Sequence, residues 1–178
     1  FIDIGQKLGA ENFLKYYKAF GLDKRTGIDL PGEGTSIFHD EERFLSNKVD
    51  LATASFGQNF QISPIQLITA VSAVANGGNL MQPYIVKEIL AEDGSIVKST
   101  EPTVVRQVIS EETSELMCDI LESVVSEGTG KNAYIAGYRI AGKTGTSEKK
   151  VRQAETGRTD LYAASFIAFA PADDPQVA

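Results

Sequence analysis

Cysteine and histidine are nearly absent from the sequence. Its 178 residues contain one cysteine, Cys118, and one histidine, His39. A single cysteine excludes a disulfide framework and a cysteine zinc site, and a single histidine excludes a His-rich metal site. A Ser-His-Asp triad would depend on His39, which we interpret as a surface loop residue. We interpret Cys118 as a small buried hydrophobe, and we expect neither a metal nor a cofactor.

Long apolar runs and a positive net charge are also missing. No run approaches the roughly 18–20 apolar residues of a membrane span, and no signal peptide is present. The formal net charge of −7 argues against a general partner of nucleic acid or of anionic membranes. The hydrophobic content of 42% exceeds that of a disordered tail, and the length suits one domain. We find no internal repeat and no domain boundary.

Capping signals predict several helices. One is expected over 2–20 with an interruption at Gly9, a brief one near 47–55, and one opened by Ser110. The clearest signal is Ser63-Pro64-Ile65-Gln66, a capping box that starts a helix ending at Gly77-Gly78. The expected inner faces of the last two helices are Ile65, Ile68, Val71, Val74 and Ala75 in the capped helix and Leu116, Ile120, Leu121 and Val124 in the other.

Strand signals complete a mixed α and β (α+β) fold. Asp93-Gly94 predicts a hairpin between 84–90 and 96–97, and a short strand is expected at 28–30. After a polar loop, residues 161–170 are apolar on both faces, which is typical of a central strand. The ends of the chain read as segment interiors, since Phe1 is no natural start and 173–178 resemble a turn and the start of a strand. We therefore predict a piece of a longer protein.

Residues 137–144 match the phosphate-binding pattern G-x-x-x-x-G-K-[ST]. This pattern forms a phosphate cradle only where a tight loop is followed at once by a helix. Here Tyr138–Ala141 favour a strand, and Gly145 stands where a helix would have to continue. Nucleotide binding through Gly137–Thr144 is therefore the weakest of the functional hypotheses.

Two S-x-x-K pairs, Ser95 with Lys98 and Ser147 with Lys150, could in principle place a lysine beside a serine nucleophile. The first pair falls on the expected hairpin and the second in a charged loop. Because neither opens a helix with apolar support, we interpret both as chance matches.

Lys143-Thr144-Gly145-Thr146 has the character of a strand that borders an active site. The lysine supplies a positive charge, the threonines supply hydroxyl donors, and Gly145 removes a side chain so that a substrate can approach the backbone. A backbone N–H on such an edge can stabilise an oxyanion during acyl transfer. Residues 143–158 carry five positive and two negative charges in a chain of net charge −7, which favours a substrate with a carboxylate.

Three stretches resemble the class B penicillin-binding proteins, most closely those of the sporulation and cell-division type. Ala141–Thr146 is similar to the third active-site motif of this family and of the serine β-lactamases. Phe56–Asn59 followed by Ile62–Leu67 resembles its glycine-glutamine loop and capped helix, and 162–173 resembles the strand after the third motif. Many relatives have glycine at Asn59, but asparagine tolerates a positive φ.

The resemblance implies the penicillin-binding protein transpeptidase fold, with a helical part and an antiparallel sheet, and a two-step acyl transfer. A serine attacks the penultimate D-alanine carbonyl of a peptidoglycan stem peptide, and an amine of a neighbouring stem peptide resolves the acyl-enzyme into a cross-link. β-Lactam antibiotics acylate the same serine. By this resemblance Lys143 belongs to the proton and electrostatic network, Thr144, Gly145 and Thr146 contact the donor, and the Thr146 N–H is half of the oxyanion hole.

The resemblance also implies which parts lie elsewhere. The serine nucleophile with its lysine and a second, S-x-N motif are expected before Phe1, and a last strand after Asp174. Residues 1–178 would then be a single incomplete domain, inactive alone, of a parent anchored at the outer face of a bacterial cytoplasmic membrane beside division or sporulation membrane proteins. An unpaired edge of 161–170 would favour self-association. The alternative is a non-catalytic module that holds a peptide or a β-lactam.

Overall fold

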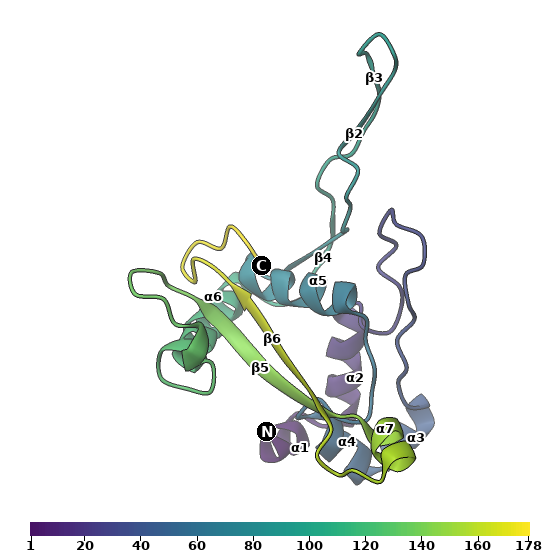
Figure 1. Ribbon diagram of the computed structural model, residues 1–178, viewed down its shortest axis with the longest axis vertical. Coiled ribbons are helices and arrows are strands. Elements are labelled where there is room, and N and C mark those ends of the chain that lie inside the picture. Colours follow the sequence, from purple (N-terminus) through teal and green to yellow (C-terminus); the bar gives the residue numbers. More distant parts are fainter. The chain divides into compact units, whose positions relative to one another are not determined.

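The computed structural model describes the backbone of residues 1–178 and every side chain except those of Lys150 and Val151. The chain divides into two compact units. Unit 1 comprises Phe1–Val74 and Gly78–Ser110, and unit 2 comprises Ala75–Gly77 and Glu111–Ala178. Helices and short antiparallel sheets occur in the chain (Figure 1), so the predicted mixed α and β class is confirmed. None of the helices in the described part of the chain is long and apolar enough to cross a membrane.

The first segment of unit 1 forms two helices. Gly9 adopts a φ of 80° between α1 (Ile2–Leu8) and α2 (Ala10–Ala19), which confirms the expected interruption. The apolar side chain of Ile4 is 66% exposed. The buried residue of α1 is Gly5. The side chain of Ser55 packs so closely against it that a β-carbon on residue 5 would overlap with Ser55.

Two further short helices, α3 (Glu41–Ser46) and α4 (Lys48–Ala54), complete the helical part of unit 1. Only α4 had been predicted. Asp40 caps α3 by accepting a hydrogen bond from Arg43 N, and Asn47 caps α4 in the same way from Val49 N. The core of this part contains Leu14, Phe44, Leu51 and Ala54, with Ala10, Phe13, Phe38 and Phe60 packed against it.

The prediction that His39 is a surface residue is wrong. Its side chain is 13% exposed, and its ring stacks on Phe44 with the centroids 6.1 Å apart. Its Nδ1 lies 3.8 Å from Oδ2 of buried Asp50, which also accepts a hydrogen bond from Arg43 Nε at 3.0 Å. The aromatic residues around His39 bury it, and a sequence pattern cannot show this.

Side-chain hydrogen bonds hold the long loop after α2. The strand predicted at 28–30 is wrong, since these residues form a bend without a ladder. Instead, the Glu33 carboxylate accepts hydrogen bonds from the N–H groups of Thr26 and Gly27, and the Asp29 carboxylate accepts those of Ile85 and Val86. These last two bonds lower the pKa of Asp29.

Helix α5 (Pro64–Ala75) begins at the predicted capping box. Ser63 Oγ accepts a hydrogen bond from Gln66 N at 3.3 Å, and Ser63 N donates to Gln66 Oε1 at 2.8 Å. The expected inner face is wrong, because the buried residues of α5 are Gln66, Ala70 and Ala73. The Gln66 amide takes the interior position because it binds the carbonyl oxygens of Leu22 and Lys24 at 3.2 and 2.7 Å.

The strands of unit 1 form two antiparallel pairs. Strand β1 (Asn79–Met81) pairs with β4 (Val104–Gln107), and β2 (Glu88–Leu90) pairs with β3 (Ile96–Ser99). The second pair is the predicted hairpin, with Gly94 at a φ of 83° in its turn. In Figure 1 this hairpin extends away from the helices of unit 1.

Unit 2 consists of helix α6 (Glu111–Ser126), the 3-10 turn η1 (Lys131–Ala133), strand β5 (Ala141–Glu148), helix α7 (Lys150–Thr156) and strand β6 (Tyr162–Phe169). A polar loop was expected between the two strands, but the structure has helix α7 there. Gln153 Nε2, in this helix, donates hydrogen bonds to the carbonyl oxygens of Thr159 and Leu161, which precede β6. The first five residues of strand β6 are exposed. The prediction of a central strand buried on both faces is therefore wrong for this part of β6.

The buried face of α6 also differs from the prediction. Leu116 and Ile120 are 59% and 48% exposed, while Ser114, Cys118 and Val125 are buried. Cys118 is thus the small buried residue that was expected, and burial raises the pKa of its thiol. After β6, Ala170 and Val177 form an isolated antiparallel bridge across the turn that had been predicted there.

Candidate active site on strand β5

Strand β5 carries the four candidate residues, and its partner β6 fixes their register. Lys143 lies opposite Ile167, Thr144 opposite Phe166, Gly145 opposite Ser165 and Thr146 opposite Ala164. Side chains alternate between the two faces of a strand, so Thr144 and Thr146 share one face and Lys143 and Gly145 the other. Among the residues whose structure is described, β6 is the one strand that pairs with β5.

The ladder also sets the direction of the backbone groups. Lys149 N, just beyond β5, donates to Leu161 O at 2.9 Å, so the odd-numbered residues of β5 direct their N–H groups toward β6. Because this direction alternates along an antiparallel strand, the N–H groups of Thr144 and Thr146 point to the opposite edge. Lys143 Nζ reaches the same edge, where it donates to the carbonyl oxygen of Thr144 at 2.8 Å. One edge of β5 thus combines a cation with backbone donors.

Thr144 also has a side-chain partner that the sequence analysis missed. Its Oγ1 lies 3.0 Å from Oγ1 of Thr129, in the turn after α6. The signal in the sequence, Gly128-Thr129-Gly130, indicates a turn but not its neighbour, because the two threonines are brought together only by the packing of α6 against β5.

The glycines of β5 lie where a side chain would collide with β6. A β-carbon on Gly142 would lie 2.7 Å from Phe166 Cζ, and one on Gly145 would lie 2.6 Å from Ser165 Oγ. The space beside Gly145 on this face is therefore filled by Ser165. The absence of a side chain at Gly145 therefore allows β5 and β6 to lie in contact here.

The basic segment after β5 is less positive than the count over 143–158 indicated. Arg158 forms two hydrogen bonds with the Asp160 carboxylate, at 2.9 and 2.8 Å, and Asp160 lies just outside that count. This pairing lowers the pKa of Asp160 and raises that of Arg158. Lys143, Lys149 and Arg152 remain exposed cations near the strand.

The structure contradicts the phosphate-cradle hypothesis. Gly137 lies in a turn with a φ of 87°, but Gly142, Lys143 and Thr144 continue as extended strand rather than as the start of a helix. The S-x-x-K matches also fall on strand and turn. Ser95 binds Asp93 in the hairpin turn, and Ser147 lies in β5, with the side chain of Lys150 outside the described residues.

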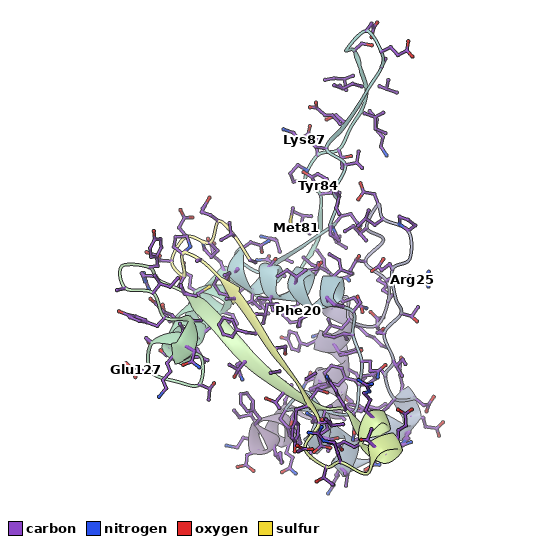
Figure 2. The ribbon with its side chains drawn as sticks, viewed as in Figure 1. Phe20, Arg25, Met81, Tyr84, Lys87 and Glu127 are labelled. Atoms are coloured by element: carbon purple, nitrogen blue, oxygen red, sulfur yellow. The ribbon has the colours of Figure 1, made fainter. Side chains whose placement is uncertain are left out.

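One cavity in each unit has a volume of about 260 or 370 Å³, and residues 143–146 line neither of these two cavities. The smaller one lies in unit 1 and includes Phe20, Arg25 and Met81, which are labelled in Figure 2. No group of three or more His, Cys, Asp or Glu side chains within the described residues could hold a metal ion. The chemistry of the candidate site thus rests on the edge of β5.

A family model of the penicillin binding protein transpeptidase domain matches residues 1–178. The chain belongs to this family. Asn59, where many relatives have glycine, has a positive φ of 68°, a conformation that asparagine tolerates. The capped helix α5 follows it in the chain.

Several known proteins are similar to the chain over nearly all of its length. Stage V sporulation protein D of Bacillus subtilis is 49% identical over 99% of this chain and 27% of that protein. PbpB of Mycolicibacterium smegmatis is 32% identical over 97% of this chain and 27% of that protein. The structure of penicillin-binding protein 3 from Mycobacterium tuberculosis, complexed with ampicillin, has a TM-score of 0.86 at 30% identity, covering 98% of this chain and 40% of that one. The chain spans about a quarter of the length of these curated relatives.

Proposed function

We propose that the protein containing this chain is a serine-type D,D-transpeptidase that cross-links peptidoglycan stem peptides. The observation that carries the proposal is the edge of β5, where Lys143 Nζ and the N–H groups of Thr144 and Thr146 gather in a chain of the transpeptidase family. Such an edge offers positive charge and aligned donors to a substrate that ends in a carboxylate and develops an oxyanion during acyl transfer.

Each residue of the motif has a separate role in this proposal. Lys143 belongs to the proton-transfer network around the serine nucleophile, and its positive charge stabilises negative charge beside that serine. The hydroxyls of Thr144 and Thr146 bind the carboxylate of the donor peptide, and the N–H of Thr146 donates to the oxyanion. Gly145, between them in the sequence, contributes its backbone to the strand that the donor approaches. The acyl-enzyme forms as the terminal D-alanine leaves, and an amine of a second stem peptide then takes the acyl group.

The proposed nucleophile is not among residues 1–178, so the isolated chain is inactive. The support is the position of the two S-x-x-K serines, one in a hairpin turn and one within β5. A serine paired with a lysine one helical turn later needs a helix, and neither pair lies wholly on one.

The proposed surroundings follow from the same reaction. The substrate lies in the bacterial envelope, so we propose that the parent is anchored at the outer face of the cytoplasmic membrane by a segment outside this chain. Its partners there are membrane proteins of division or sporulation, and β-lactams are its inhibitors.

We also propose that the isolated chain self-associates through the edge of β6 that faces away from β5. Light scattering that gives the mass of a monomer at all concentrations would contradict this.

Intact-mass analysis after incubation with a penicillin tests the function. We expect a covalent adduct on the protein at its natural length and none on residues 1–178. Lys143→Ala should slow acylation at least about 100-fold, as expected for loss of a proton-transfer group, while Lys131→Ala, an exposed lysine of η1, should not. An adduct on the short chain would identify a serine within it. No adduct on the folded longer protein would favour the non-catalytic binding module.

A further inference from the structure

The turn after α6 places Thr129 in a defined position. Glu127, labelled in Figure 2, begins the turn, and Gly130 N closes it by donating to Val124 O at 2.9 Å. A β-carbon on Gly128 or Gly130 would lie 2.8 or 3.0 Å from that same carbonyl oxygen. Gly130 is buried, whereas Thr129 between the two glycines is exposed. The backbone contacts around it therefore hold the turn in place without any help from the Thr129 hydroxyl.

What the hydroxyl does contact is Thr144. The two Oγ1 atoms are 3.0 Å apart, and either can be the donor. A hydroxyl has one hydrogen and can accept two hydrogen bonds. If Thr129 donates, the hydrogen of Thr144 is left to donate to a further oxygen atom. If Thr144 donates, its hydroxyl can only accept from a ligand.

We propose that Thr129 is a positioning residue that makes Thr144 selective for a carboxylate; this rests on the proposed function. A carboxylate can only accept hydrogen bonds. Its arrival selects the arrangement in which Thr129 donates to Thr144 and Thr144 donates to the ligand, because hydrogen bonds in such a chain strengthen one another. A neutral carboxamide carries donors as well as an acceptor, so it can pair with Thr144 in either arrangement.

A selectivity measurement separates this role from a structural one. Two thioester donor analogues that differ only in a terminal carboxylate or carboxamide are reacted with the protein at its natural length, and the second-order rate constant of acylation is measured for each. Thr129→Val keeps the shape of the side chain and removes the hydroxyl, whereas Thr129→Ser keeps the hydroxyl. Thr103→Val is the control, since Thr103 is an exposed threonine of unit 1 whose hydroxyl binds only a backbone carbonyl.

We expect Thr129→Val to lower the ratio of the carboxylate to the carboxamide rate about threefold, because Thr144 can still donate to the carboxylate and loses only the strengthening that Thr129 gives this bond. Thr129→Ser and Thr103→Val should keep the ratio within about 1.5-fold. Thr129→Ala is the second variant should Thr129→Val fail to fold.

The outcomes that contradict the two proposals differ. An equal fall of both rates in Thr129→Val, or no fall, would overturn the role of Thr129 while leaving the transpeptidase function in place. A folded wild-type protein that reacts with neither analogue nor with a penicillin would overturn the proposed function, and the role of Thr129 with it.

Discussion

Arg139 donates two hydrogen bonds to the carboxylate of Glu122, at 2.9 and 2.6 Å. Its remaining Nη1 lies 2.8 Å from Oδ2 of Asp173, and its backbone carbonyl accepts the N–H of Ala172 at 2.9 Å. One residue just before β5 thus joins helix α6 to the segment after β6. These bonds hold the start of β5 and the end of β6, the two strands of the candidate site, close to α6.

We expect Glu122→Gln to lower the free energy of unfolding by about 1 kcal/mol, because both partners are partly exposed and water screens their attraction. Urea denaturation monitored by circular dichroism measures the change. Glu127→Gln removes the same charge from the exposed turn just after α6 and should leave stability within about 0.5 kcal/mol of wild type. Equal losses in the two variants would show that the pairing with Arg139 contributes nothing.

The same pair predicts a dependence on pH. Hydrogen bonds from Arg139 lower the pKa of Glu122 below its ordinary 4.5 in the folded protein. A carboxylate whose pKa is lowered by folding stabilises the protein fully above its unfolded value and loses this contribution as the pH falls through its folded value. The stability difference between wild type and Glu122→Gln should therefore be constant from about pH 7 to pH 5 and shrink below about pH 4.5. A difference that grows on acidification would contradict this.

Gln66 should be the most sensitive residue of α5. Its side chain is 1% exposed, and it supplies an acceptor to the capping box and two donors to the carbonyl oxygens of Leu22 and Lys24. Gln66→Leu leaves these groups without partners and should cost about 2–4 kcal/mol in the free energy of unfolding. Ser63→Ala, which removes only one capping bond, should cost about 1 kcal/mol. Thermal and urea unfolding of the two variants provide the comparison, and equal losses would contradict the interior role of Gln66.

A double substitution can separate the packing role of Gly145 from a role in binding substrate. Gly145→Ala alone should destabilise the protein by about 1–3 kcal/mol, because its β-carbon would meet Ser165 Oγ at 2.6 Å. Adding Ser165→Ala removes that oxygen and should restore most of the stability. If the double variant is stable but is acylated by a penicillin much more slowly than Ser165→Ala alone, Gly145 also serves the substrate. Equal acylation rates would limit it to packing.

Local chemistry alone determined much of this protein. The capping box at Ser63, the Asp93-Gly94 hairpin, the break at Gly9 and the strand at Lys143–Thr146 were all predictable, because each depends on neighbours within a few residues of the chain. The third motif and the chain-wide resemblance also led to the transpeptidase family.

Tertiary structure decided the features that depend on distant partners. Gln66 is inside because two carbonyl oxygens of the loop after α2 need its amide, and His39 is largely buried because Phe38, Phe44 and Asp50 lie around it. Thr129 meets Thr144 only through the packing of α6 against β5. Periodicity identifies which residues share a face of a helix. Which face is buried depends on the hydrogen-bonding groups and the space that neighbouring segments offer, and those segments become neighbours only when the chain folds.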